Sequence, residues 1–418
     1  MGSSINRIKE NIISLYGLQF VNYILPLISM PYLVRILGPE IYGEVIYALT
    51  VVGYFTLLVD YGFNLTGTSA VARVKNDSEK LRKIFTSVLC IKLGFILISA
   101  ILIFFIYHIY GSLNLHIGIF LMTFCIVFTN VLFPTWFLQG LEEMKFLTLC
   151  NITSRILFTI AIFWVVKNER DAIYVPMLNF FGAIISGVVS IIYLRKKLGH
   201  LLIKIGSKDI NKYLKEGFGV FVSTISISFY TLSVTLILGI LETKEAVGYY
   251  GAADKLVQAL KALSIPIATA LYPVISYKLS KNQQLGIAYA IRNGKKLWLV
   301  MGILALISFF SAELIVNLIF GIEFQQSIVL LRILSIVPFL VSVSNVLGIQ
   351  IMLNIDLKKE FTAAVSSISI IGLCLTYVLI NNYGMIGAAI SVVIIEAIVA
   401  LTFYIILKQK LSTSKLKF

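Results

Sequence analysis

The sequence predicts an all-α integral membrane protein in which 418 residues form twelve spanning helices. Apolar residues make up 59% of the chain, charged residues only 13%, and the mean hydropathy is +0.94. Soluble domains carry about a quarter charged residues, so this composition excludes an ordinary soluble fold. A spanning helix needs about 20 mainly apolar residues, and a chain of this length accommodates about a dozen of them joined by short loops.

Long apolar windows recur along the chain, six before a lysine-rich stretch at 195–213 and six after it. Backbone polar groups find no water in hydrocarbon, so continuous apolar windows of this length are predicted to be helices. The expected spans lie at 11–36, 42–66, 84–110, 116–141, 147–166, 173–194, 216–241, 247–275, 297–320, 327–353, 361–380 and 385–407.

The basic residues predict the orientation, because cytoplasmic loops of membrane proteins are enriched in lysine and arginine. If the N-terminus is cytoplasmic, the cytoplasmic loops and termini hold 26 of the 35 basic residues. The loops on the other side hold three, Lys167, Arg170 and Lys244. The net charge of +15 therefore reflects topology, both termini are expected in the cytoplasm, and no nucleic-acid partner is expected.

An internal repeat predicts two bundles of six helices, at 1–205 and 206–418. The sequence PEIYGEVIYA at 39–48 aligns with KEAVGYYGAA at 244–253, and the identical pairs are Glu40 and Glu245, Gly43 and Gly248, and Ala48 and Ala253. An even number of spans in each half makes the repeats parallel, an arrangement found in secondary transporters. Their substrate sites lie near the bilayer midplane between the halves, and we expect the same here.

Within the predicted spans we single out six cations and three anions, because a charged residue costs about 2.5–3.5 kcal/mol at a helix centre. Such residues are expected to face protein or water and to serve a function. The cations are Arg35, Lys92, Arg155, Lys255, Lys261 and Arg332, and the anions are Asp60, Asp254 and Glu396.

Structural alternatives remain open for some of these charges. Arg35, Lys92 and Arg155 lie near predicted span ends, from which a long side chain can extend to the interface. Asp254 and Lys261 are seven residues apart and share a helix face, so they could form an internal ion pair.

The excess of cations among these nine residues predicts a cavity that attracts anions such as phosphate or pyrophosphate and repels cationic drugs. Glu396 is solitary and near mid-span, so it is a candidate for coupling transport to protons or Na⁺, or for a hydrogen bond between helices. Asp60 lies toward the inner end of the second span and could pair with a basic neighbour.

The sequence lacks common catalytic motifs. No GxxxxGK[ST], GxSxG or HExxH pattern occurs, so ATP hydrolysis and common hydrolytic chemistry find no support. Only three histidines occur, without a carboxylate cluster, and neither a metal site nor a cofactor is expected. These observations favour a carrier over an enzyme.

Five stretches carry a family resemblance: PYLVRILGPEIYG at 31–43, DYGFN at 60–64, WFLQGLEEM at 136–144, VGYYGAADK at 247–255 and ALYPVIS at 270–276. They resemble the Wzx-type O-antigen and polysaccharide flippases, whose superfamily also contains the MATE drug exporters and the lipid II flippase MurJ. The RxLGxxxYG and VGYY motifs are the ones most specific to the polysaccharide branch. That branch often has Glu where this chain has Asp254, a departure that keeps the charge.

The resemblance implies twelve helices in two six-helix bundles around a central cavity that opens alternately to either side. It implies a flippase for an undecaprenyl-pyrophosphate-linked oligosaccharide, the O-antigen repeat unit, moving it from the cytoplasmic to the periplasmic leaflet of a bacterial inner membrane. H⁺ or Na⁺ and other polysaccharide-assembly membrane proteins are the further expected partners. By this similarity the candidates for cargo binding are Arg35, Lys255, Lys261 and Arg332, and those for gating or ion coupling are Asp60, Asp254 and Glu396.

Two alternatives of other classes remain. A MATE-like multidrug cation antiporter would have an acidic cavity, which the six-to-three excess of cations among the charges singled out above disfavours. A membrane polysaccharide polymerase or ligase would carry a large outside loop, and the outside loops predicted here are short.

Overall fold

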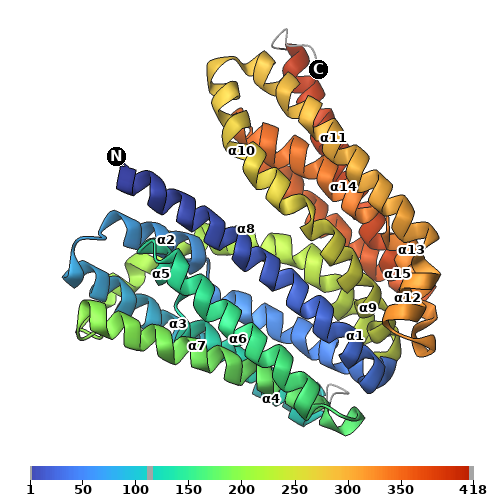
Figure 1. Cartoon of the computed structure of the whole chain (residues 1–418), viewed down its shortest axis with the longest axis horizontal. Coiled ribbons are helices and arrows are strands. Elements are labelled where there is room, and N and C mark those ends of the chain that lie inside the picture. Colours follow the sequence, from blue (N-terminus) through green and yellow to red (C-terminus); the bar gives the residue numbers. More distant parts are fainter. Residues whose placement is uncertain (1, 111–115, 414–418) are drawn as a thin grey trace. The chain divides into compact units, whose positions relative to one another are not determined.

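The computed structural model describes residues 2–110 and 116–413, with side chains from 25 to 411 except 106, 107, 109–115, 227 and 230. Arg7 and Lys9, expected on the cytoplasmic side, lie outside the described side chains. Every regular element in the described residues is a helix, as Figure 1 shows, and this confirms the predicted all-α class.

The helices form two compact units. Unit 1 comprises Met1–Leu37 and Glu44–Ile225, and unit 2 comprises Gly38–Gly43 and Ser226–Phe418. The division falls inside helix α8 (Ser207–Leu241), while six residues of the first repeat belong to the second unit. The boundary predicted at residue 205 stays a prediction.

Unit 1 holds most of α1 (Gly2–Asp60) and the first part of α8. Between them come α2 (Phe63–Arg73), α3 (Ser78–Tyr110), α4 (Ile117–Leu132), α5 (Thr135–Gly140), α6 (Met144–Val165), the short η1 (Glu169–Ile173) and α7 (Tyr174–Leu198). Helix α7 packs against α4 and α6, and α6 and α7 run side by side in Figure 1. Gly187 permits the close packing of α7 on α4, because a Cβ at this position would lie 2.9 Å from Cβ of Leu132.

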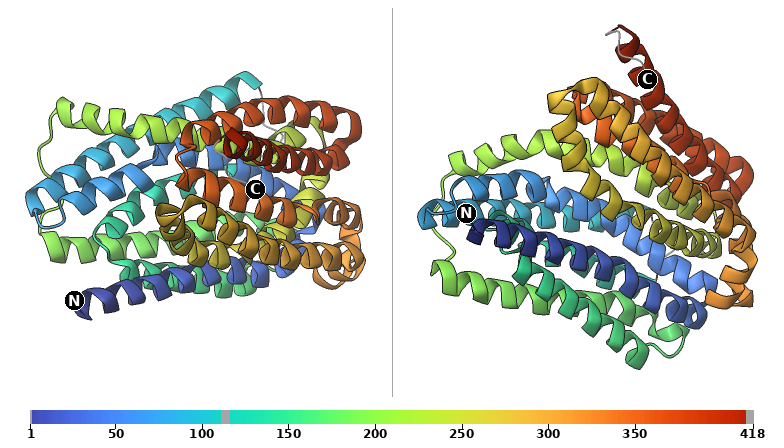
Figure 2. Two further views of the ribbon diagram at one scale, coloured as in Figure 1. Left: turned by 90° about the horizontal axis from the view of Figure 1, so that it is seen from above. Right: turned by 45° about the horizontal axis from the view of Figure 1, so that its top comes forward.

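Unit 2 begins within α8 and continues through helices whose bounds are α9 (Lys244–Ala262), α10 (Ser264–Lys281), α11 (Gln283–Phe310), α12 (Ala312–Ile319), η2 (Ile322–Phe324), α13 (Gln326–Leu334), α14 (Val337–Ser344), η3 (Asn345–Ile351), η4 (Met352–Asn354) and α15 (Lys358–Thr413). Helices α10 and α11 lie side by side in Figures 1 and 2. The core of this unit includes Leu297, Met301, Ile351 and Phe403.

Nine helices of the described residues are long and apolar enough to cross a membrane, or ten if the bent pair Ser207–Ser226 and Thr231–Leu241 is one span. Two of the nine contain residues with non-helical backbone angles, Gly38 (φ 65°) and Gly384 (φ 57°). These breaks lie between predicted spans one and two and between spans eleven and twelve. The count of twelve stays a prediction.

Many apolar side chains point away from the packed interior of each unit. Leu97, Phe104 and Ile307 are each more than half exposed, and similar residues occur along most long helices. A soluble protein rarely exposes apolar surface on this scale, so lipid is the fitting environment.

Candidate functional site

A small pocket in unit 2 gathers three of the seven predicted site residues. Its volume is about 40 Å³, which holds about three water molecules. Helices α8, α9 and α15 line it with Thr231, Tyr250, Asp254, Gln258, Lys261, Val392, Ile395 and Glu396. Asp254, Lys261 and Glu396 are the predicted site residues among them.

Helix α9 presents one polar face to this pocket. Thr243 caps the helix, its hydroxyl oxygen accepting a hydrogen bond from the backbone N–H of Ala246 at 3.3 Å. From there Tyr250, Asp254 and Gln258 recur every fourth residue and lie on one face. Gln258 Nε2 donates a hydrogen bond to Asp254 Oδ1 at 3.3 Å, which orients this carboxylate.

Packing against α13 and the 38–43 segment fixes α9 in position. The Ser327 hydroxyl of α13 donates a hydrogen bond to the backbone carbonyl of Tyr249 at 2.9 Å. Tyr42 and Tyr250 are 5% and 3% exposed, and Tyr250 lines the pocket four residues before Asp254. Both tyrosines are therefore packed in the interior of unit 2.

Glu396 reaches the pocket from α15, in the half of that helix that follows the break at Gly384. The fully buried small residues Ala388, Ala389 and Ser391 allow this half to pack closely. Asp254 and Lys261 line the same pocket as Glu396, and a role of Glu396 in ion coupling stays a prediction. Two carboxylates and one ammonium group leave the pocket with one excess negative charge.

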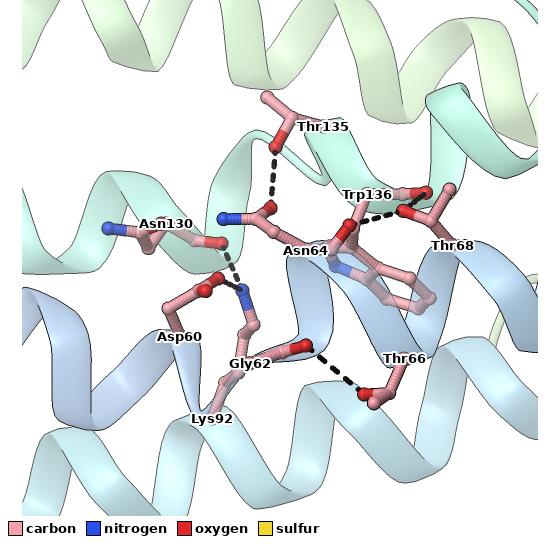
Figure 3. Close-up of polar contacts among 9 residues, drawn as sticks. All are labelled: Asp60, Gly62, Asn64, Thr66, Thr68, Lys92, Asn130, Thr135 and Trp136. Atoms are coloured by element: carbon pink, nitrogen blue, oxygen red, sulfur yellow. Dashed lines mark hydrogen bonds and ion pairs between the residues drawn. The ribbon is translucent and has the colours of Figure 1, made fainter. Parts of the chain in front are cut away.

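Asp60 lies in unit 1 and forms a buried ion pair. Lys92 Nζ of α3 lies 3.5 Å from Asp60 Oδ1 and 3.4 Å from the backbone carbonyl oxygen of Asn130. Figure 3 marks both contacts. The side chains of Lys92 and Asp60 are 3% and 15% exposed. The expected pairing of Asp60 with a basic neighbour is confirmed, whereas extension of Lys92 to the interface is wrong.

The residues that follow Asp60 form a turn between α1 and α2. Gly62 adopts φ 77°, a conformation that favours glycine, and α2 begins directly after it. The Thr68 hydroxyl on α2 donates a hydrogen bond to the backbone carbonyl of Trp136 at 3.0 Å (Figure 3). Tyr61 and Phe63 of the DYGFN stretch lie in the same buried cluster as Trp136 and Phe137 of the WFLQG stretch, so the two stretches meet within unit 1.

The four predicted cargo-binding cations do not share one environment. Only Lys261 lines the pocket, and Lys255 is exposed on another face of α9. Arg332 on α13 lies 3.7 Å from Glu313 on α12, with side chains 41% and 67% exposed. Arg35 is exposed on α1 in unit 1.

Glu44 of unit 1 is a second buried carboxylate, and it was not among the residues predicted from the sequence. Its side chain is 0% exposed, and its Oε2 lies 2.5 Å from Nδ1 of His116, the residue before α4. The backbone N–H of His116 also donates to Glu44 Oε1. The one signal in the sequence was a carboxylate near the start of the second apolar window.

The comparisons with known proteins agree with this fold. The family model described as "Polysaccharide biosynthesis protein" matches residues 8–278. A protein of Escherichia coli (strain K12) described as an O-antigen transporter is 32% identical over 392 residues, which are 94% of this chain and 94% of that protein.

Two solved structures share the fold at low sequence identity. An inward-facing MATE multidrug resistance transporter aligns with TM-score 0.76 and 14% identity, covering 94% of this chain and 95% of that chain. The lipid II flippase MurJ in an inward closed conformation aligns with TM-score 0.73 and 15% identity, covering 95% and 87%. These likenesses concern the fold, and they confirm the predicted resemblance to this group of helical transporters.

Proposed function

The chain belongs to the polysaccharide biosynthesis protein family, and from this premise we propose that it is a flippase for a lipid-linked oligosaccharide. The observation that carries the proposal is the end-to-end match to the Escherichia coli protein described as an O-antigen transporter. The cargo would be an undecaprenyl-pyrophosphate-linked O-antigen repeat unit, moved from the cytoplasmic to the periplasmic leaflet of a bacterial inner membrane. Both termini would then lie in the cytoplasm, as the distribution of basic residues predicts.

The protein would act without catalysis. Alternating access requires only that the cargo site open to one side and then the other, so no bond of the cargo needs to break. Lys255, Lys261, Arg332 and Arg35 are proposed to meet the pyrophosphate or the first sugar at successive stages. Lysine and arginine are suited to this because their charge attracts phosphate oxygens and their N–H groups donate to them.

The pocket is proposed to couple transport to an ion. Its volume of about 40 Å³ is far below the roughly 300–1,000 Å³ of pockets that hold drug-sized ligands, so the oligosaccharide does not enter it, and Lys261 would meet the cargo only when the pocket widens during the transport cycle. Ionisable residues in spans commonly mark ion pathways and proton relays. Glu396 and Asp254 would supply the carboxylates, and Asp60 would stabilise unit 1 through Lys92.

The second candidate function is cation antiport of the multidrug type. The excess negative charge of the pocket favours it, because a cationic drug needs a carboxylate partner. The small volume of the pocket disfavours it, since a drug cannot enter. Resistance to cationic dyes in a strain that expresses the protein separates the candidates, and the flippase proposal expects no gain in resistance.

The test of the flippase proposal is complementation. Expression in a strain lacking its own O-antigen flippase is expected to restore surface polysaccharide, and the double variant Lys255→Ala/Lys261→Ala is expected to lose most of it. Lys281→Ala, an exposed lysine at the end of α10, is the matched control and should retain it. Normal polysaccharide from the double variant at a normal protein level would remove the cationic cargo site.

A further inference from the structure

The hairpin of helices α10 and α11 in unit 2 is basic and contains no carboxylate. Residues 264–310 include five lysines and arginines and neither aspartate nor glutamate, so this segment supplies +5 of the net charge of +15. The five residues are all exposed, and they are Lys278, Lys281, Arg292, Lys295 and Lys296. The charge of the hairpin is therefore not balanced within its own sequence.

The rest of the described structure does not balance it either. Three exposed or half-buried lysines of unit 1 each lie within 3.0 Å of a carboxylate oxygen, and the pairs are Lys75 with Glu142 at 2.5 Å, Lys80 with Asp77 at 2.8 Å and Lys83 with Asp209 at 3.0 Å. The ion pairs that the described residues of unit 2 form are Arg332 with Glu313 and Lys410 with Glu360. Neither involves the hairpin, whose cations are free to meet an anion from outside the chain.

Close packing of the two helices brings a cation of α10 onto α11. A Cβ at Gly286 of α11 would lie 2.7 Å from Cα of Leu279 on α10, so the helices meet at backbone level near the turn. Lys278 Nζ of α10 lies 4.6 Å from the centre of the Tyr289 ring on α11, a cation–π contact. Tyr289 precedes Arg292 by three residues and shares its helix face. The ammonium group of Lys278 therefore joins the cations of α11.

The cations of α11 lie at the edge of an exposed apolar face. Arg292, Lys295 and Lys296 fall within about 6 Å along the helix axis. Seven residues after Arg292 and Lys296, on the same face, come Leu299 and Ile303, which are 66% and 48% exposed. Cations that border apolar surface in this way extend their charged ends to the level of lipid headgroups, while their aliphatic parts stay on the apolar side.

An anionic phospholipid satisfies both parts of this face. Its phosphate accepts hydrogen bonds from lysine and arginine, and its acyl chains cover the apolar residues beyond them. A zwitterionic lipid carries its own cation next to the phosphate, so it gains less from the same residues. A soluble acidic protein would meet the cations and leave Leu299 and Ile303 uncovered.

We propose that Lys278, Arg292, Lys295 and Lys296 form a binding site for the headgroup phosphate of anionic phospholipids. Each basic residue beside an anionic lipid surface raises the affinity by about fivefold, so several together select the anionic lipid over the zwitterionic one. The site is separate from the pocket of Asp254 and Glu396 and does not depend on which cargo is moved.

Quenching of tryptophan fluorescence by brominated lipids tests the proposal, because it reports which lipid lies beside a chosen position. The reporter is the full-length protein with Ile303→Trp on the proposed face and with Trp164→Phe, which removes an 81% exposed tryptophan. It is reconstituted in phosphatidylcholine with an equal fraction of brominated phosphatidylglycerol or brominated phosphatidylcholine. The phosphatidylglycerol is expected to quench more, with a relative affinity of about fivefold or greater.

Neutral variants of the reporter identify the residues responsible. Arg292→Gln/Lys295→Gln/Lys296→Gln is expected to bring the relative affinity close to one. Lys75→Gln/Lys80→Gln/Lys83→Gln removes the same number of cations where each has a carboxylate partner, and it is expected to keep the preference. If the first triple variant does not fold, Lys295→Gln/Lys296→Gln takes its place and is expected to lose most of the preference.

Two results would overturn the proposal. Equal quenching by the two brominated lipids in the unaltered hairpin would show that its cations face water or an acidic protein. A neutral hairpin that keeps the preference for phosphatidylglycerol would show that other groups bind the headgroup. Neither measurement involves polysaccharide export, so failure here is distinguishable from failure of the flippase proposal.

Discussion

Gly43 packs against the backbone of the helical turn before Gly248, and Gly248 packs against the backbone of the turn before Gly43. A Cβ at Gly43 would lie 1.9 Å from the carbonyl oxygen of Lys244, and a Cβ at Gly248 would lie 2.0 Å from that of Pro39. These glycines occupy equivalent positions in the internal repeat, so the match between the halves reflects close packing of the two turns. Gly38 has another reason to be glycine, its positive φ of 65°.

Substitution of Gly248 tests this contact. Gly248→Ala is expected to lower the free energy of unfolding by about 1–3 kcal/mol, because the methyl group would force two backbones apart. The control is Gly302→Ala on α11, where the new Cβ would lie 3.6 Å from the nearest atom, an ordinary contact. This control is expected to change little or to gain up to about 1 kcal/mol from helix propensity. Equal thermal stability of both variants would contradict the interpretation.

The ion pair of Asp60 and Lys92 predicts a strongly non-additive pair of substitutions. Asp60→Asn leaves a buried ammonium group without its carboxylate and is expected to cost about 3–5 kcal/mol. Adding Lys92→Met removes the buried charge and is expected to recover most of the loss. Thermal unfolding of the purified single and double variants provides the comparison. A double variant less stable than Asp60→Asn alone would assign Lys92 a separate role.

The helices and the faces they present were predictable from local properties of the sequence. Apolar run length predicted the spans, and the seven-residue spacing of Asp254 and Lys261 predicted a shared face. Periodicity within one helix does not reveal which helix lies opposite. The pairing of Asp60 with Lys92 and of Glu44 with His116, and the shared pocket of Lys261 and Glu396, therefore required the fold.

Cation counts predict the orientation of the chain, which cysteine labelling tests. In a cysteine-free background, Lys167→Cys is expected to react with a membrane-impermeant maleimide in spheroplasts. Lys204→Cys, in the segment between α7 and α8, is expected to react only after lysis. The four native cysteines to be replaced are Cys90, Cys125, Cys150 and Cys374. The reverse pattern would place both termini outside.

Glu396 is expected to make export depend on the proton gradient. The lining residues Asp254, Lys261 and Glu396 have a formal net charge of one negative unit, so protonation of Glu396 would make the pocket formally neutral. Glu396→Gln mimics the neutral state permanently, and a pocket that cannot change charge cannot respond to the gradient. In the complemented strain, a protonophore is expected to reduce surface polysaccharide with wild type and to have little further effect on the low level reached with Glu396→Gln.

A distant carboxylate provides the control for that experiment. Glu360 pairs with Lys410 at 2.9 Å, away from the pocket, and exposed pairs contribute little stability. Glu360→Gln should therefore keep both the polysaccharide level and its sensitivity to the protonophore. If Glu396→Gln also keeps both, at equal protein level, the carboxylate serves packing between α9 and α15, and the ion that drives transport must act on other groups.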